Sequence, residues 1–186
     1  MEKFNELSKS INKEIEEVFN RIDANQLDNL MQEIIRANKI VLVGVGREGI
    51  STRAFAMRLM HLGKESHWVW DDTTPGLENG DLLIATSGSG EIGHIHYVVN
   101  EAKKAGSRIV LVTGVPDRKT AQLADVILWV PASVYHGKGN VVPSIQPMGN
   151  LFEQSLFILY DLIVILLMEK MNVSSEEMEK RHRNIE

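Results

Sequence analysis

Two glycine-rich segments contain most of the residues whose types and spacing could do chemistry. The first reads Gly44-Val45-Gly46-Arg47-Glu48-Gly49, and the second reads Ser87-Gly88-Ser89-Gly90-Glu91. Glycines let backbone N–H groups approach an anion closely, and the two serine hydroxyls can donate further hydrogen bonds. Together the segments predict a site for a small phosphorylated ligand. The candidate ligand-binding residues are Gly46, Arg47, Glu48, Ser87, Gly88, Ser89, Gly90 and Glu91.

The first segment on its own also fits another class of protein. It matches the pattern G-x-G-x-x-G of dinucleotide-binding folds, and Asp71 and Asp72 follow the next predicted strand, where a ribose-binding acid would stand. A nucleotide-dependent oxidoreductase is therefore an alternative. The second segment favours the phosphate-site interpretation, because a dinucleotide fold does not require a serine–glycine loop at that point.

Both segments follow short apolar runs that alternate with helical patterns, which predicts an α/β sandwich around a five-stranded parallel sheet. In a flavodoxin-like strand order, 2-1-3-4-5, the crevice opens beside the carboxyl ends of strands one and three. Those two strands carry the glycine-rich segments. Strands are expected at residues 40–43, 67–70, 82–85, 109–112 and 126–130, and helices at about 51–62, 93–104 and 118–123.

Helical patterns flank this core at both ends of the chain. Apolar residues at three- and four-residue steps predict two N-terminal helices, and residues 151–171 predict a long closing helix that is apolar nearly all round. One face of a sheet cannot cover such a helix, so a homo-oligomer is expected. We expect a single domain over residues 1–186, made of an N-terminal helical segment (1–38), an α/β core (39–148) and a C-terminal helix and tail (149–186).

Composition and charge narrow the classes of function. The chain is 44% apolar and 24% charged, which is typical of globular proteins, and it has no cysteine, which excludes disulfides and suits a reducing cytoplasm. A net charge of -5 argues against broad nucleic-acid binding. The longest apolar run, 156–168, is too short to span a bilayer, and the N-terminus lacks the apolar core of a secretory signal. We expect a cytoplasmic protein that binds neither nucleic acid nor membrane.

Several longer motifs resemble one family. SGSGE after the third strand and GVGREG after the first resemble the sugar isomerase (SIS) domain family. AFAMRLMHLG at 54–63 resembles the first helix of 6-phospho-3-hexuloisomerases, QPMGNLFEQ at 146–154 resembles the segment before their last long helix, and RHRN at 181–184 resembles their C-terminal end. The resemblance implies a tetrameric enzyme that interconverts D-arabino-hex-3-ulose 6-phosphate and D-fructose 6-phosphate in the ribulose monophosphate pathway of formaldehyde fixation or detoxification.

The implied reaction moves a carbonyl group from C3 to C2 through a cis-enediol. It needs a placed base and polarisation of the carbonyl oxygen, and we expect no metal or other cofactor. The candidate base is Glu153, because its apolar neighbours in the sequence would make an idle buried carboxylate unfavourable. His61 and His182 are candidates for opening the furanose ring of fructose 6-phosphate. His182 lies on the tail, so we expect it to reach a neighbouring subunit's site.

Two positions depart from the family pattern. Glu48 stands where members commonly have serine, and Ile92 stands where a threonine hydroxyl is common. A carboxylate beside a phosphate dianion is repulsive, so Glu48 is expected to offer its backbone N–H or to face a sugar hydroxyl, while Arg47 supplies positive charge. An isomerase of another phosphosugar and a non-catalytic sugar-phosphate-binding module remain alternatives. Replacing Glu153 with glutamine should stop an isomerase and leave a binding module largely unaffected.

Overall fold

The computed structural model describes residues 1–135 and 139–185, and within them five strands form one sheet. Their order is β2-β1-β3-β4-β5, and every neighbouring pair is parallel. The predicted α/β class and flavodoxin-like strand order are therefore confirmed. The strands are β1 (Lys39–Val43), β2 (Glu65–Trp68), β3 (Leu82–Thr86), β4 (Arg108–Thr113) and β5 (Val126–Trp129).

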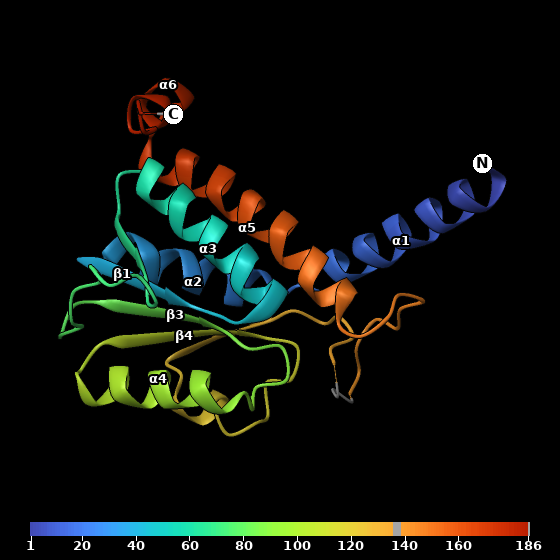
Figure 1. The fold of residues 1–186 in the computed structure, drawn as a ribbon, viewed down its shortest axis with the longest axis horizontal. Coiled ribbons are helices and arrows are strands. Elements are labelled where there is room, and N and C mark those ends of the chain that lie inside the picture. Colours follow the sequence, from blue (N-terminus) through green and yellow to red (C-terminus); the bar gives the residue numbers. More distant parts are fainter. Residues whose placement is uncertain (136–138, 186) are drawn as a thin grey trace.

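Helices cover both faces of the sheet (Figure 1). One face carries α2 (Ala24–Arg36), α3 (Gly46–His61) and α5 (Asn150–Met171), and the other carries α4 (Gly93–Lys104) and a short 3-10 turn, η1 (Ala121–Leu123). Successive strand side chains point to opposite faces. In β1, Ile40 and Leu42 join the core beneath α3 and α5, whereas Val41 and Val43 join the core above α4. The continuous apolar strands thus reflect burial on both faces.

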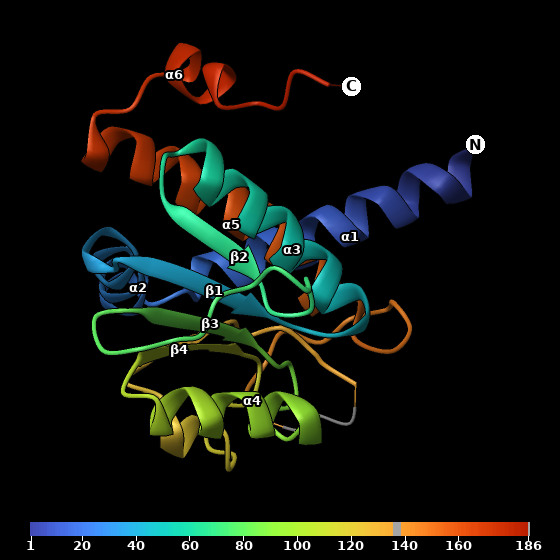
Figure 2. The ribbon, with the colours of Figure 1, turned by 60° about the vertical axis from the view of Figure 1, so that its left-hand side comes forward.

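Two further helices lie at the margins of the molecule. α1 (Glu2–Asn20) packs against α5, and its N-terminal part projects away from the body (Figures 1 and 2). Its apolar residues Phe4 and Leu7 are exposed. α6 (Ser175–Lys180) lies near the C-terminal end of α3 and begins with the predicted capping box, in which Ser174 Oγ accepts a hydrogen bond from Glu177 N at 3.2 Å.

Three predicted boundaries differ from the structure because long-range contacts decide them. The first core helix begins at Gly46 rather than at residue 51, directly after the loop. β2 lies two residues earlier than predicted, because Glu65–Trp68 is the stretch that pairs with β1. The helix predicted at 118–123 is only the turn η1, where Thr120 N donates to Gly90 O at 3.3 Å instead of continuing a helix. The helix predicted at 93–104 is confirmed at both ends.

The closing helix α5 is apolar nearly all round, as predicted, and it is longer than the apolar run 156–168. By length and composition its 22 residues could cross a membrane, although 50% of its most apolar window is buried inside the fold. Its exposed apolar residues form a surface that we call the α5 stripe. The α5 stripe consists of Phe157, Ile158, Leu162 and Ile165, which are 40–61% exposed.

Candidate active site

The two glycine-rich loops meet at the carboxyl edge of the sheet. β1 and β3 are hydrogen-bonded neighbours, so the loops that follow them lie side by side. They border a pocket of about 470 Å³, which we call the loop pocket. Of the predicted site residues, those that line it are Gly46, Arg47, Glu48, Ser89, Glu91 and Glu153.

The first loop turns directly into α3 because two glycines allow its backbone to fold back on itself. A Cβ atom on Gly49 would lie 2.9 Å from the backbone of Gly44, which is closer than a side chain tolerates. The first turn of α3 is therefore packed against the end of β1. This close approach places the backbone and side chains of Arg47 and Glu48 at the mouth of the loop pocket.

The second loop is held by the neighbouring strand β4. Ser87 N donates to Val112 O at 3.0 Å, and Thr113 Oγ1 donates to Gly88 O at 3.2 Å. Ser87, Gly88 and Gly90 are buried behind the pocket surface, whereas Ser89 reaches it. Ser87 Oγ is buried and has no hydrogen-bond partner among the described residues. An unpartnered buried hydroxyl is unfavourable, so this oxygen has unused hydrogen-bonding capacity directly behind the pocket surface.

Glu153 lies in the first turn of α5 and faces the first loop. Arg47 connects the two elements: its Nη1 donates to Asn150 Oδ1 at 3.1 Å, and its Nε lies 3.0 Å from Glu153 Oε2. This ion pair lacks hydrogen-bond alignment, so Glu153 Oε2 is buried without a hydrogen-bond donor among the described residues. The free lone pairs of that oxygen can accept a proton from a bound ligand.

Glu48 was expected to offer its backbone N–H or to face a sugar hydroxyl, and its side chain does something more specific. Its Oε2 accepts a hydrogen bond from Gly88 N at 3.0 Å, so the carboxyl group lies against the second loop. Burial raises the pKa of Glu48 to about 7, with a further contribution from the nearby charge of Glu153, and the Gly88 hydrogen bond opposes the shift only in part. Glu48 is thus divided between its neutral and charged forms near neutral pH.

A buried row of hydroxyl groups ties both loops to α5. Thr52 Oγ1 lies 2.7 Å from Glu48 O and 2.8 Å from Thr86 Oγ1, and Thr86 Oγ1 lies 2.7 Å from the Tyr160 hydroxyl. The Tyr160 ring stacks on Phe55 with 4.5 Å between ring centroids. The elements that carry Glu48, Ser87 and Glu153 are therefore fixed relative to one another by polar and aromatic contacts.

The two candidate histidines do not lie in the loop pocket. His61 stands at the opposite end of α3, about 22 Å from Gly46 at the rise of an α-helix. Its ring is buried and stacks on His182, with 5.3 Å between ring centroids. Burial lowers the pKa of His61, and the positive charges of Arg58 and its neighbours lower it further. Within one chain, the structure brings His61 and His182 together but places both far from Glu153.

Sequence reasoning missed several residues that complete the loop pocket. Arg118 follows β4 and pairs with Glu91 at 3.3 Å, while Tyr135 and Met148 come from the segment between β5 and α5. The position of Arg118 could have been anticipated, because the carboxyl end of the next strand borders the same crevice. The other two belong to irregular chain, where no periodic pattern marks a site.

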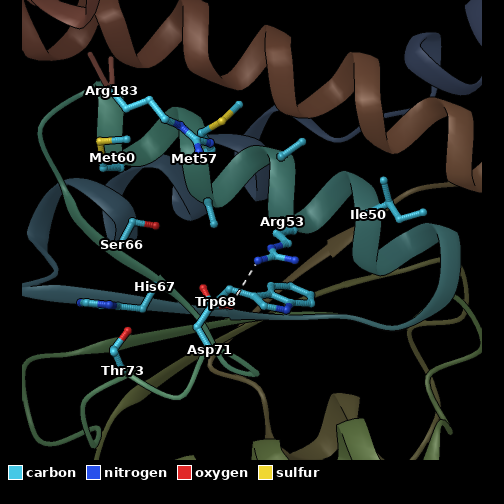
Figure 3. Close-up of a pocket in the computed structure, with 12 residues that line it drawn as sticks. Ile50, Arg53, Met57, Met60, Ser66, His67, Trp68, Asp71, Thr73 and Arg183 are labelled. Carbon is cyan, nitrogen blue, oxygen red and sulfur yellow. Dashed lines mark hydrogen bonds and ion pairs between the residues drawn. The ribbon is translucent and has the colours of Figure 1, made fainter. Parts of the chain in front are cut away.

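A second groove runs between α3 and the edge strand β2 (Figure 3). Met57 and Met60 line it and are 39% and 36% exposed. Arg53 and Asp71 face each other across part of this groove, with 3.2 Å between Nη2 and Oδ1. None of the residues predicted to bind the ligand lines it. In residues 1–135 and 139–185 there is also no cluster of three or more His, Asp or Glu side chains that could hold a metal ion.

Comparison with known proteins identifies the family of this chain. The sequence model of the SIS domain family matches residues 33–159. A Bacillus subtilis protein named 3-hexulose-6-phosphate isomerase is 38% identical over 89% of each chain, and one of the same name from Mycobacterium gastri is 37% identical over 93% of this chain and 86% of its own. A Methanococcus jannaschii crystal structure, described as inferring a molecular function of 3-hexulose-6-phosphate isomerase, superposes with a TM-score of 0.82 at 34% identity over the full length of both chains. The strand order, the two paired loops and these similarities together establish that the chain belongs to the SIS domain family.

Proposed function

We propose that this chain is a sugar-phosphate isomerase that converts D-arabino-hex-3-ulose 6-phosphate to D-fructose 6-phosphate. The observation that carries the proposal is the meeting of two glycine-rich loops and a largely buried carboxylate around one pocket. The relatives named 3-hexulose-6-phosphate isomerase support this choice of substrate. The chain would then act after formaldehyde capture in the ribulose monophosphate pathway, in the cytoplasm.

In the proposed reaction, the second loop holds the phosphate and Glu153 moves the carbon-bound proton. Ser87 Oγ and Ser89 offer hydroxyl groups, and Arg118 supplies positive charge at the same pocket. The Glu153 carboxylate removes the proton from C2, which gives the cis-enediol, and then returns it to C3. The Arg47 guanidinium lies beside this base, 3.0 Å from its Oε2.

The proposed site draws on a second subunit. His61 and His182 are too far from Glu153 to act with it inside one chain. The α5 stripe and the projecting part of α1 provide exposed apolar surface that an assembly would bury. We therefore expect a homo-oligomer, a tetramer as the motifs imply, in which the histidines of one subunit face the loop pocket of another and open the sugar ring.

The test is a coupled assay. Purified protein is mixed with enzymatically generated hex-3-ulose 6-phosphate, and fructose 6-phosphate is followed through phosphoglucose isomerase and a glucose 6-phosphate dehydrogenase. Steady formation of fructose 6-phosphate is expected. When the coupling enzymes are left out, the hexulose phosphate should cause no change in nicotinamide absorbance. If none forms at any enzyme concentration, the proposed function is wrong.

Two observations support a related alternative. Glu48 occupies the Gly88 N–H, a donor that a phosphate group could otherwise use, and the hydroxyl expected at Ile92 is absent. A different phosphosugar could fit this altered pocket, so the same assay should include arabinose 5-phosphate. A non-catalytic binding module would show binding of fructose 6-phosphate in calorimetry but would not convert the hexulose phosphate.

A further inference from the structure

Two carboxyl groups line the loop pocket in opposite electrostatic settings. Glu153 lies beside the guanidinium of Arg47, which stabilises its negative charge. Glu48 has no such cation at its carboxyl group in the described structure; it accepts one backbone hydrogen bond, from Gly88. Pairs of carboxyl groups whose surroundings favour different protonation states are well suited to divide acid and base roles between them.

The proposed reaction leaves one proton without a carrier. When Glu153 takes the C2 proton, the carbonyl oxygen on C3 must gain a proton to become the enediol hydroxyl. When the proton returns to C3, the hydroxyl on C2 must lose its proton to become the new carbonyl. A neutral carboxylic acid can do both, because it donates through its O–H group and accepts through its carbonyl oxygen.

We propose that Glu48 is this carrier: its carboxyl group gives a proton to O3 as the enediol forms and recovers one from O2 as the enediol collapses. The step balances, since Glu48 and Glu153 each end the cycle in the state in which they began. The inference rests on the proposed function, because it assigns the oxygen-bound proton of that same reaction.

The second loop is shaped to receive this carboxyl group. A Cβ atom at position 88 would lie 2.5 Å from Glu48 Oε1, so a side chain there would displace the carboxyl group from its present position. The Gly88 N–H is a donor and Oε2 accepts it, which assigns the carbonyl role to Oε2 and leaves Oε1 to carry the proton. Gly88 and Glu48 therefore fit together as a positioned acid.

The other ionisable groups around the pocket are less suited to this role. Glu91 is about half exposed and pairs with Arg118, and the Tyr160 hydroxyl is buried and engaged by Thr86. His61 lies at the far end of α3. The charged and titratable groups that face Glu48 or share its pocket are Arg47, Glu91, Arg118, Tyr135, Glu153 and Tyr160.

Glu48→Gln tests the inference, because glutamine keeps the size of the side chain and an acceptor for Gly88 but cannot transfer a proton. We expect kcat for the hexulose phosphate to fall by about 10²-fold or more, with KM little changed and with part of the rate restored in Glu48→Asp. The exposed Glu169→Gln on α5 is the matched control and should behave like the wild type. A purely structural role for Glu48 would leave Glu48→Gln as active as the wild type, which would overturn the inference.

The pH profile separates this inference from the proposed function. Wild-type kcat/KM should decline as pH rises above about 7, and this decline should be absent in Glu48→Gln. Carbon-13 NMR of the glutamate carboxyl groups, without substrate, should show one signal titrating near 7 that Glu48→Gln removes. An active wild type with no such signal, or with the same alkaline decline in the variant, overturns the assignment of Glu48 alone. An inactive wild type overturns the proposed function and the assignment with it.

Discussion

The two ends of α3 carry side chains of opposite charge type. At the N-terminal end, Glu48 and Glu153 share the loop pocket with the two glycine-rich loops. At the C-terminal end, His61 and His182 border a larger hollow of about 730 Å³ together with Arg58 and Arg183. One end holds acids that can move protons, and the other holds basic groups that suit an anionic ligand. The helix separates them, so assembly of the chains is what would bring the two chemistries together.

The largest effect is expected at the acidic end. Glu153→Gln should lower kcat by about 10²- to 10⁴-fold, because glutamine cannot take the carbon-bound proton, while binding of fructose 6-phosphate measured by calorimetry should persist. Glu169→Gln, an exposed change on the same helix, serves as the control. Wild-type turnover in Glu153→Gln would show that the acidic end is not the catalytic end.

Changes at the basic end should lower turnover by less than Glu153→Gln does. They should act on the site of a neighbouring subunit rather than on the site of the same chain. His61→Asn is expected to lower turnover by about 10²-fold, with the exposed His94→Asn as control. When His61→Asn and Glu153→Gln chains are co-expressed, mixed assemblies should regain measurable activity, because one site can then combine an intact histidine with an intact glutamate. If co-expression restores nothing, the two ends do not form a shared site.

The two ends should also respond to pH with opposite signs. The pKa of Glu48 is raised from 4.5 to about 7 in the folded protein, so the free energy of unfolding should fall as pH rises between these values, by at most roughly 3 kcal/mol. The pKa of His61 is lowered by burial, so the free energy of unfolding should fall as pH falls below about 6.5. Urea unfolding of the wild type, Glu48→Gln and His61→Asn from pH 5 to 8 measures both differences. If the free energy of unfolding changed with pH in the same way in the wild type and in Glu48→Gln, the prediction for Glu48 would be wrong.

The smallest effect concerns the contacts that hold the acidic end in place. Tyr160→Phe keeps the stacking on Phe55 but removes the hydroxyl that meets Thr86. We expect a loss of about 1–2 kcal/mol in the free energy of unfolding by urea. Tyr97→Phe, whose residue is 64% exposed, should change it by less than about 0.5 kcal/mol. Equal losses in the two variants would mean that the buried hydroxyl contributes nothing special.

Sequence patterns predicted the parts of this molecule that depend on local order. The alternation of apolar runs and helices gave the sheet, its strand order and the two loops, because the carboxyl ends of neighbouring strands meet. The contact between Glu48 and Gly88 joins residues forty positions apart, and the pair of Arg47 and Glu153 joins two helices that are still further apart in the sequence. Periodicity carries no information on such pairs. The edge strand β2 was misplaced for the same reason, since its partner β1 decides which residues pair.

The row of hydroxyls from Tyr160 to the first turn of α3 contains no ionised group. Thr52 Oγ1 lies within hydrogen-bond distance of Glu48 O, a backbone carbonyl that can only accept, and of Thr86 Oγ1, which in turn hydrogen-bonds the Tyr160 hydroxyl. Burial raises the pKa of Tyr160 to about 12, and the threonines do not titrate, so the row stays uncharged throughout the range in which the Glu48 side chain gains and loses its proton. The backbone of Glu48 is thereby anchored by an uncharged relay while its carboxyl group changes charge.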